Sequence, residues 1–206
     1  MPVVDASPAF AEAAADDGIV LGPQSFDWLS EQGHLGLQQV AMDRRDPALR
    51  VPVTTAVEAL TAIYDSLRGD RAVLSNARSN LFLPVDLVHE PTGTLIELDE
   101  SLHFTSFRLA TFDLYPPTTA LGFDLDEYKE LCRAWSSQTD NISRGLAAKG
   151  FGFGGVQRQR AYQDAVRDLA TPAMGHPPLV RIVALDGDGA AAYQRQRDTL
   201  LKLLER

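Results

Sequence analysis

The pattern of apolar and polar positions between residues 81 and 104 predicts two β-strands joined by a tight turn. The turn, Glu90-Pro91-Thr92-Gly93, has proline and glycine at the positions that a β-turn favours. Both apolar runs contain carboxylates where a strand normally carries aliphatic side chains: Asp86 in the first run, and Glu97 and Asp99 in the second. Burying such groups is unfavourable unless a positive charge meets them.

Helical periodicity predicts that most of the remaining chain is helical. Ser7-Pro8 begins a capped N-terminal helix, and Gly69 ends a helix that starts at Thr54 or Thr55. Pro47 and Pro52 are expected to bracket a turn, and residues 105–120 to be irregular. The other predicted elements are a short helix over 25–32, a helix from Asp124 or Asp126 to about 135, helices over about 157–170 and 190–205, and a strand over 179–185.

This order of elements predicts an α/β fold, with a mixed central β-sheet that carries an acidic hairpin and has helices on both faces. We expect a helical extension over residues 1–50 and a core over residues 51–206, with a helical insertion at about 115–155. The sequence contains no internal repeat and no low-complexity linker, so one compact domain is the simplest account.

Composition narrows the class of protein without indicating an activity. The chain has 206 residues, of which 45% are hydrophobic and 23% charged, as is ordinary for a globular domain. Its single cysteine, Cys132, excludes an internal disulfide and a cysteine-based zinc site. We expect a cytoplasmic protein without a secretory signal or a membrane span. The net charge of −9 counts against a broad, nonspecific nucleic-acid surface.

The acidic hairpin suggests a metal site. Alternation along a strand places Glu97 and Asp99 on one side, and hairpin geometry places Asp86 roughly opposite them on the neighbouring strand. Converging carboxylates suit Mg²⁺ (or Mn²⁺), which keeps several waters for a substrate phosphate. Such an ion polarises a phosphoryl group and helps to form hydroxide from bound water. His103 is a candidate proton carrier beside it.

The order Pro84-x-Asp86, turn, Glu97-Leu-Asp99, His103-Phe104 resembles the PD-(D/E)XK nuclease superfamily. It is most similar to the very-short-patch-repair endonuclease-like branch, whose second motif commonly reads Glu-x-Asp-Gly-x-x-His. A downstream segment, RAYQDAVRDL followed by the strand LVRIV, resembles the Arg/Asp-rich helix and following strand of that branch. The resemblance extends over residues 54–206, apart from the insertion.

The resemblance implies a restriction endonuclease-like core and a metal-dependent endonuclease that hydrolyses phosphodiester bonds in DNA. Asp86 and Glu97 would then be metal ligands, and Asp99 would stand where the family usually has a catalytic lysine. Glu58, on the helix before the hairpin, matches an acidic residue that often supports the metal.

The basic candidates for substrate binding are Arg78, Arg160 and Arg167. By the resemblance, Arg160 and Arg167 approach a phosphate or brace the site. Nucleases of this kind often work as homodimers or in larger assemblies, so such a partner is expected as well as DNA.

Three departures from the family pattern bear on catalysis more than on fold. Val85 separates Pro84 from Asp86, Glu100 replaces the usual glycine, and no lysine follows the second motif. The alternative hypothesis is therefore a catalytically inactive protein of the same fold that acts as a binding or assembly subunit.

Each candidate also has a purely structural interpretation. The hairpin acids can face solvent at the edge of a one-sided sheet, and His103 can pack or cap a strand end. Glu58 can simply favour a helix dipole. The charges of residues 160–168 can form an exposed, salt-bridged helix face, and Arg78 can organise a turn.

Overall fold

The computed structural model describes residues 5–142 and 144–204 of the chain. Its elements, in chain order, are α1 (Ser7–Ala15), α2 (His34–Arg44), α3 (Pro47–Ser66), α4 (Arg71–Ser75), β1 (Leu87–His89), β2 (Thr94–Asp99), η1 (Ser101–His103), α5 (Ser106–Thr111), η2 (Phe112–Leu114), α6 (Leu125–Ile142), α7 (Val156–Ala173), β3 (Val180–Val183) and α8 (Gly189–Leu204). None of these described helices is long and apolar enough to cross a membrane.

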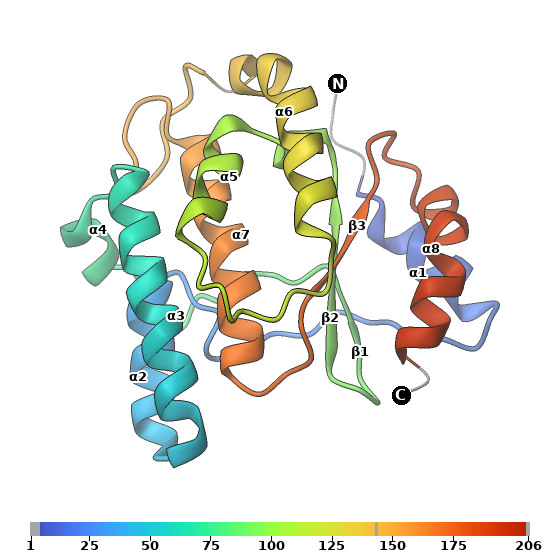
Figure 1. The fold of residues 1–206 in the computed structure, drawn as a ribbon, viewed down its shortest axis with the longest axis horizontal. Coiled ribbons are helices and arrows are strands. Elements are labelled where there is room, and N and C mark those ends of the chain that lie inside the picture. The colour runs from blue at the N-terminus through green and yellow to red at the C-terminus, as the bar shows by residue number, and fades with distance from the viewer. Residues whose placement is uncertain (1–4, 143, 205–206) are drawn as a thin grey trace.

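A small mixed sheet lies between two groups of helices (Figure 1). Its strand order is β1-β2-β3, with β1 antiparallel and β3 parallel to β2. The helices α5, α6 and α7 lie between the hairpin and β3 in the sequence, as a crossover between parallel strands requires. The predicted α/β class, with helices flanking a mixed sheet, is confirmed at this level.

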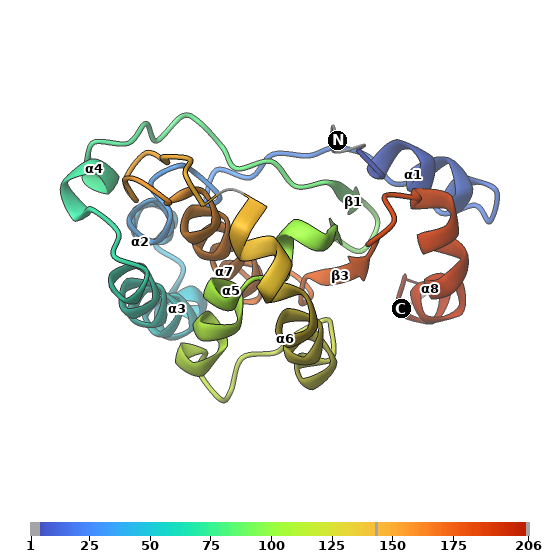
Figure 2. The same cartoon turned by 90° about the horizontal axis from the view of Figure 1, so that it is seen from above.

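The two faces of the sheet pack against different helices. Figure 2 shows α1 and α8 on one side of the sheet and α7, with α5 and α6, on the other. The first face contributes aliphatic side chains to a core with α1 and α8: Leu87, Ile96, Leu98, Val180 and Ile182. The opposite face contributes Val88 and Leu95 to the larger core, which α3 and α7 complete.

The N-terminal segment contributes to both cores. Phe10 of α1 is fully buried and makes an edge-to-face contact with Tyr193 of α8, with ring centroids 5.4 Å apart. Trp28 and Leu37 are buried in the larger core. The described part of residues 1–50 is therefore integrated with the rest of the fold.

Two predictions near the N-terminus are wrong. Pro47 and Pro52 do not bracket a turn, because both lie in α3. The Asp46 carboxylate accepts the N–H of Ala48 at 2.9 Å, and Pro47 occupies the first turn, where a missing N–H costs little. Residues 25–32 form turns and an isolated bridge rather than a helix, because the apolar side chains there are buried without helical periodicity.

The first strand of the hairpin is shorter than predicted. Asp86 precedes β1 instead of lying inside it, and its carboxylate accepts the N–H of Leu98 at 2.8 Å. At this end of the hairpin, the N–H of Leu98 therefore has the Asp86 side chain as its partner instead of a main-chain carbonyl. Residues 105–120 are not wholly irregular, since they contain α5 and η2. Thr105 caps α5 by accepting the N–H of Arg108 at 3.0 Å.

Candidate functional site

The sheet face that packs against α7 carries a layer of charged side chains. Glu97, Asp99 and Arg181 point to this side and are 4%, 0% and 6% exposed. The register of the parallel pair places Glu97 beside Arg181. The interpretation in which the hairpin acids face solvent is therefore wrong for Glu97 and Asp99.

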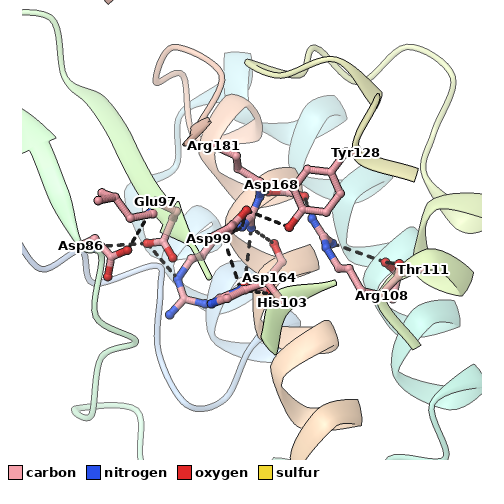
Figure 3. A network of polar contacts seen from close by, with 12 residues as sticks. Asp86, Glu97, Asp99, His103, Arg108, Thr111, Tyr128, Asp164, Asp168 and Arg181 are labelled. Carbon is pink, nitrogen blue, oxygen red and sulfur yellow. Dashed lines mark hydrogen bonds and ion pairs between the residues drawn. The ribbon is translucent and has the colours of Figure 1, made fainter. Parts of the chain in front are cut away.

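Asp99 is bound within the protein. Arg181 Nη1 donates to both Asp99 carboxylate oxygens, at 2.8 and 3.0 Å, and the Tyr128 hydroxyl donates to Oδ2 at 2.7 Å. Figure 3 shows this carboxylate among its partners, apart from the Asp86 and Glu97 pair. The Asp99 carboxylate therefore forms a structural ion pair with Arg181, and both of its oxygens accept hydrogen bonds from within the protein.

The ion pair continues into a buried network beneath α5. Arg181 Nε donates to Asp168 Oδ1 at 2.8 Å, and Arg108 Nη2 donates to Asp168 Oδ2 at 2.5 Å. The Tyr115 hydroxyl also donates to Asp168, at 2.7 Å. Burial raises the pKa of Asp168, but the guanidinium groups of Arg181 and Arg108 outweigh it, so the pKa lies below its usual range.

His103 lies between two buried carboxylates. Its Nδ1 is 3.0 Å from Asp164 Oδ2 and 3.3 Å from Asp99 Oδ1. Burial lowers the pKa of His103, yet the two carboxylates outweigh it and raise the pKa above its ordinary value. The protonated ring then donates from Nδ1 and retains Nε2 as the second donor.

Asp86 and Glu97 form the second part of the charged layer. The Asp86 N–H donates to Glu97 Oε1 at 3.3 Å, and the N–H of Leu98 donates to Asp86 Oδ2. Arg167 Nε is 3.4 Å from the same Glu97 oxygen. Within the described residues, Oδ1 of Asp86 and Oε2 of Glu97 take no part in these contacts, so each carboxylate keeps one oxygen for a ligand.

These two carboxylates are incompletely compensated for their burial. Burial raises the pKa of Asp86, against the hydrogen bond from Leu98 and the charge of Arg167. Burial raises the pKa of Glu97 to about 7; the neighbouring Asp86 adds to the effect and Arg167 opposes it. An additional cation would favour the ionised form of both groups.

A surface hollow of about 320 Å³ opens over this pair. It is lined from three directions: by the hairpin, by α7 and by the start of α1. Five of the candidates proposed from the sequence meet in it: Asp86, Glu97, His103, Arg160 and Arg167. We call it the acidic hollow.

The other three candidates are not part of the acidic hollow. Asp99 lies beneath it in the ion pair with Arg181. Glu58 lines a separate hollow between α2 and α3 and is exposed, and Arg78 is exposed in the segment after α4. The expectation that Glu58 lies beside the hairpin acids is therefore wrong, because α3 packs on the side of α7 that faces away from the sheet.

Several residues of the site were not proposed from the sequence as site residues. Arg181 lies inside the apolar strand LVRIVAL, the same signal of a charge in an apolar run that identified the hairpin acids. Glu100, Gln163 and Asp164 also line the acidic hollow. The sequence marked Glu100 only as a departure from the family pattern and Asp164 only as part of a charged helix, and no pattern marks Gln163.

The donor set fits part of a divalent-metal site. Asp86 and Glu97 supply adjacent carboxylates, and Mg²⁺ commonly binds one or two carboxylates together with waters. Among the described residues, no group of three or more His, Cys, Asp or Glu side chains is arranged to hold a metal ion. The three-carboxylate site expected from the sequence is thus reduced to two carboxylates, because Arg181 occupies Asp99.

Comparison with known proteins leaves the activity open. A family model described as "Family of unknown function (DUF7255)" matches residues 62–145. The match includes the hairpin and His103 but not α7, which carries Arg160 and Arg167. No curated protein and no solved structure matches the chain.

Proposed function

We propose that the acidic hollow is the active site of a metal-dependent nuclease that hydrolyses phosphodiester bonds in DNA. The observation that carries this proposal is the convergence of Asp86, Glu97, His103, Arg160 and Arg167 in one hollow. These residues come from segments up to 81 positions apart in the sequence, and each belongs to a residue class that phosphoryl hydrolysis uses.

Asp86 and Glu97 are the residues that would hold Mg²⁺ or Mn²⁺. A divalent ion bound there would polarise the phosphoryl group and lower the pKa of a coordinated water. Glu97, with a pKa of about 7, loses its proton readily when a cation arrives at neutral pH. The restriction endonuclease-like core remains part of this proposal.

The two arginines of α7 supply positive charge for the phosphate. Arg167 is held in place because its Nε and Nη2 both donate to the carbonyl of Pro84, at 3.1 and 2.8 Å. Arg160 lines the same hollow. A local pair of guanidinium groups can orient a phosphodiester although the chain carries a net charge of −9.

His103 is positioned to supply a proton to the leaving oxygen. Asp164 and Asp99 hold its Nδ1 and keep the ring protonated, which leaves Nε2 as the donor. General acid catalysis of this kind typically contributes about 10²–10⁴-fold to a rate.

The test is cleavage of a supercoiled plasmid with Mg²⁺ or Mn²⁺. We expect nicking by the unmodified chain, loss of nicking in Glu97→Gln, and retention in Glu58→Gln, the matched control on α3. Circular dichroism establishes that both variants are folded. Equal nicking by Glu97→Gln and the unmodified chain contradicts the proposed chemistry.

One observation favours the alternative of a catalytically inactive binding subunit. Asp99, at the position of the family's lysine, is bound by Arg181 and Tyr128 instead of facing the hollow. On that hypothesis the chain retains DNA in a gel-shift assay, through Arg160 and Arg167, and does not cleave it under any metal condition.

A further inference from the structure

The segment that joins α6 to α7 differs in charge from the rest of the chain. No acidic residue occurs between Asp140 and Asp164, the longest such interval in a sequence whose net charge is −9. Four basic residues fall within this interval: Arg144, Lys149, Arg158 and Arg160. Lys149 has an acid nearby, Glu31 at 3.9 Å, and both side chains are exposed. We call residues 144–160 the basic segment, and a polyanion can approach it with less repulsion than the acidic chain otherwise offers.

The basic segment presents one aromatic ring to solvent. Phe153 is 79% exposed, the highest value among the large hydrophobic side chains of the described residues. The other phenylalanine of the segment, Phe151, is buried and packs edge-to-face against Tyr64. The two rings therefore have different roles: Phe151 anchors the segment in the core, and Phe153 keeps most of its surface available for a ligand.

The backbone around Phe153 forms a braced turn. Gly152 and Gly154, on either side of it, have φ values of 64° and 67°, which glycine adopts without strain. Arg158 Nη2 donates to the carbonyls of both Phe151 and Phe153, at 2.7 and 3.0 Å. Because the turn is already held in place, little conformational entropy is lost when a ligand meets the ring.

Arg158 also fixes this turn near the acidic hollow. It lies on α7 two residues before Arg160, which lines the hollow, and two residues of a helix span about 3 Å along its axis. The turn that carries Phe153 is bonded to Arg158 and so lies at the same end of α7 as Arg160. Figure 1 shows the basic segment at the end of the molecule where β2 finishes. A DNA strand with one phosphate in the hollow can therefore place a base a few nucleotides away on Phe153.

We infer that Phe153 is a stacking platform for an unpaired base of the DNA strand whose phosphate occupies the acidic hollow. The inference rests on the proposed function and names its substrate class: single-stranded or locally unpaired DNA. A base inside an intact duplex is already stacked on its neighbours and must leave the stack to reach a protein side chain. Since every base has a π-face, stacking on Phe153 should depend little on the identity of the base.

The test is fluorescence anisotropy of labelled 12-nucleotide single strands and of a 12-base-pair duplex, titrated with the full chain without divalent metal. Phe153→Ala should weaken single-strand binding about 5- to 150-fold, which corresponds to the loss of one base stacked on an aromatic ring. Duplex affinity should change less than about twofold. Unchanged single-strand affinity in Phe153→Ala, an equal loss with both DNAs, or no single-strand binding by the unmodified chain overturns the inference.

Three further variants separate stacking from hydrophobic contact and from stability. Phe153→Trp should retain single-strand affinity, whereas Phe153→Leu, which keeps apolar bulk without a ring, should lose it nearly as Phe153→Ala does. Val51→Ala, at a 72% exposed position of α3, is the matched control and should leave affinity unchanged. Full affinity in Phe153→Leu would show that no stacking is involved. Since Phe153 is exposed, all of these variants should keep the melting temperature of the unmodified chain.

Phe153→Trp also gives a direct signal of stacking. Its fluorescence should be quenched on addition of a single strand, and the quenching should exceed that of the unmodified chain, whose tryptophans are Trp28 and Trp135. Equal quenching in the two proteins would place the base elsewhere and overturn the inference.

Two other results distinguish this inference from its competitors. Sedimentation may instead reveal a dimer of the unmodified chain that Phe153→Ala converts to a monomer; with single-strand affinity unchanged, that result replaces the base by a second copy of the chain. Single-strand binding that depends on Phe153, without plasmid cleavage, refutes the nuclease and leaves Phe153 as the base contact of a binding protein. Plasmid cleavage with binding that is independent of Phe153 refutes the stacking platform alone.

Discussion

Replacing Glu97 by glutamine should stabilise the protein at alkaline pH and abolish the proposed binding of Mg²⁺. The substitution keeps the size of the side chain and an oxygen that can accept from the Asp86 N–H. It removes the need to ionise a carboxyl that is 4% exposed and has Asp86 beside it. The variant therefore removes both the energetic cost of ionising Glu97 and the carboxylate proposed to bind the metal, so the two effects can be measured in the same protein.

The magnitude follows from the pKa of Glu97, which burial raises from 4.5 to about 7. Between these values the folded protein holds a proton that the unfolded chain has lost, so its stability falls as the pH rises. Each pH unit corresponds to about 1.36 kcal/mol, so the full effect is about 3 kcal/mol above pH 7. The glutamine of Glu97→Gln does not ionise, so the free energy of unfolding of this variant does not fall in this way as the pH rises.

The assay is urea unfolding of both proteins across the pH range. Below the unfolded pKa of 4.5 the free energies of unfolding should agree, and above about pH 7 the variant should be more stable by about 3 kcal/mol. Adding Mg²⁺ at about 100 times its dissociation constant should stabilise the unmodified chain by about 2.7 kcal/mol and the variant not at all.

Glu58→Gln is the control, because it makes the same change at an exposed position on α3. It should leave the pH dependence and the Mg²⁺ effect intact. The reasoning is refuted if Glu97→Gln is less stable than the unmodified chain at pH 8. That result would mean that Arg167 fully compensates an ionised Glu97.

Three further predictions concern the rest of the charged layer. Asp99→Asn should reduce the free energy of unfolding by about 3–5 kcal/mol, because it removes the negative charge that Asp99 places beside the buried Arg181. Urea titrations measure this change, and a reduction of less than about 1 kcal/mol would contradict a structural role for Asp99. His103→Gln should be most destabilising below pH 6.5. The raised pKa of His103 contributes stability that is fully present below that pH and is lost as the pH rises through the pKa of the folded state. A difference in unfolding free energy between the two proteins that grows with pH would be inconsistent with this. The logarithm of DNA affinity against the logarithm of salt concentration should have a slope of about −2, since Arg160 and Arg167 are the arginines lining the acidic hollow; filter binding with a slope beyond about −6 would indicate a broad basic surface instead.

The sequence determined the local elements with a clear period and the identity of the central acids. Helices α7 and α8 lie close to the predicted ranges, and α6 begins where predicted but continues to Ile142 instead of ending near residue 135. The apolar positions of all three recur at helical spacing. Asp86 and Glu97 were identified by carboxylates in apolar runs and by their distance across the turn. The hydrogen bond between them confirms that they are adjacent.

Only the tertiary structure decided which acids face a ligand and which meet a counterion. Asp99 and Arg181 are 82 positions apart, and the register of β2 and β3 brings them together. Periodicity reports which side of its own strand a residue occupies, and it carries no information about the strand or helix that covers that side. Glu97 and Asp99 therefore share a face and a pattern in the sequence, yet one opens to the acidic hollow and the other is neutralised within the core.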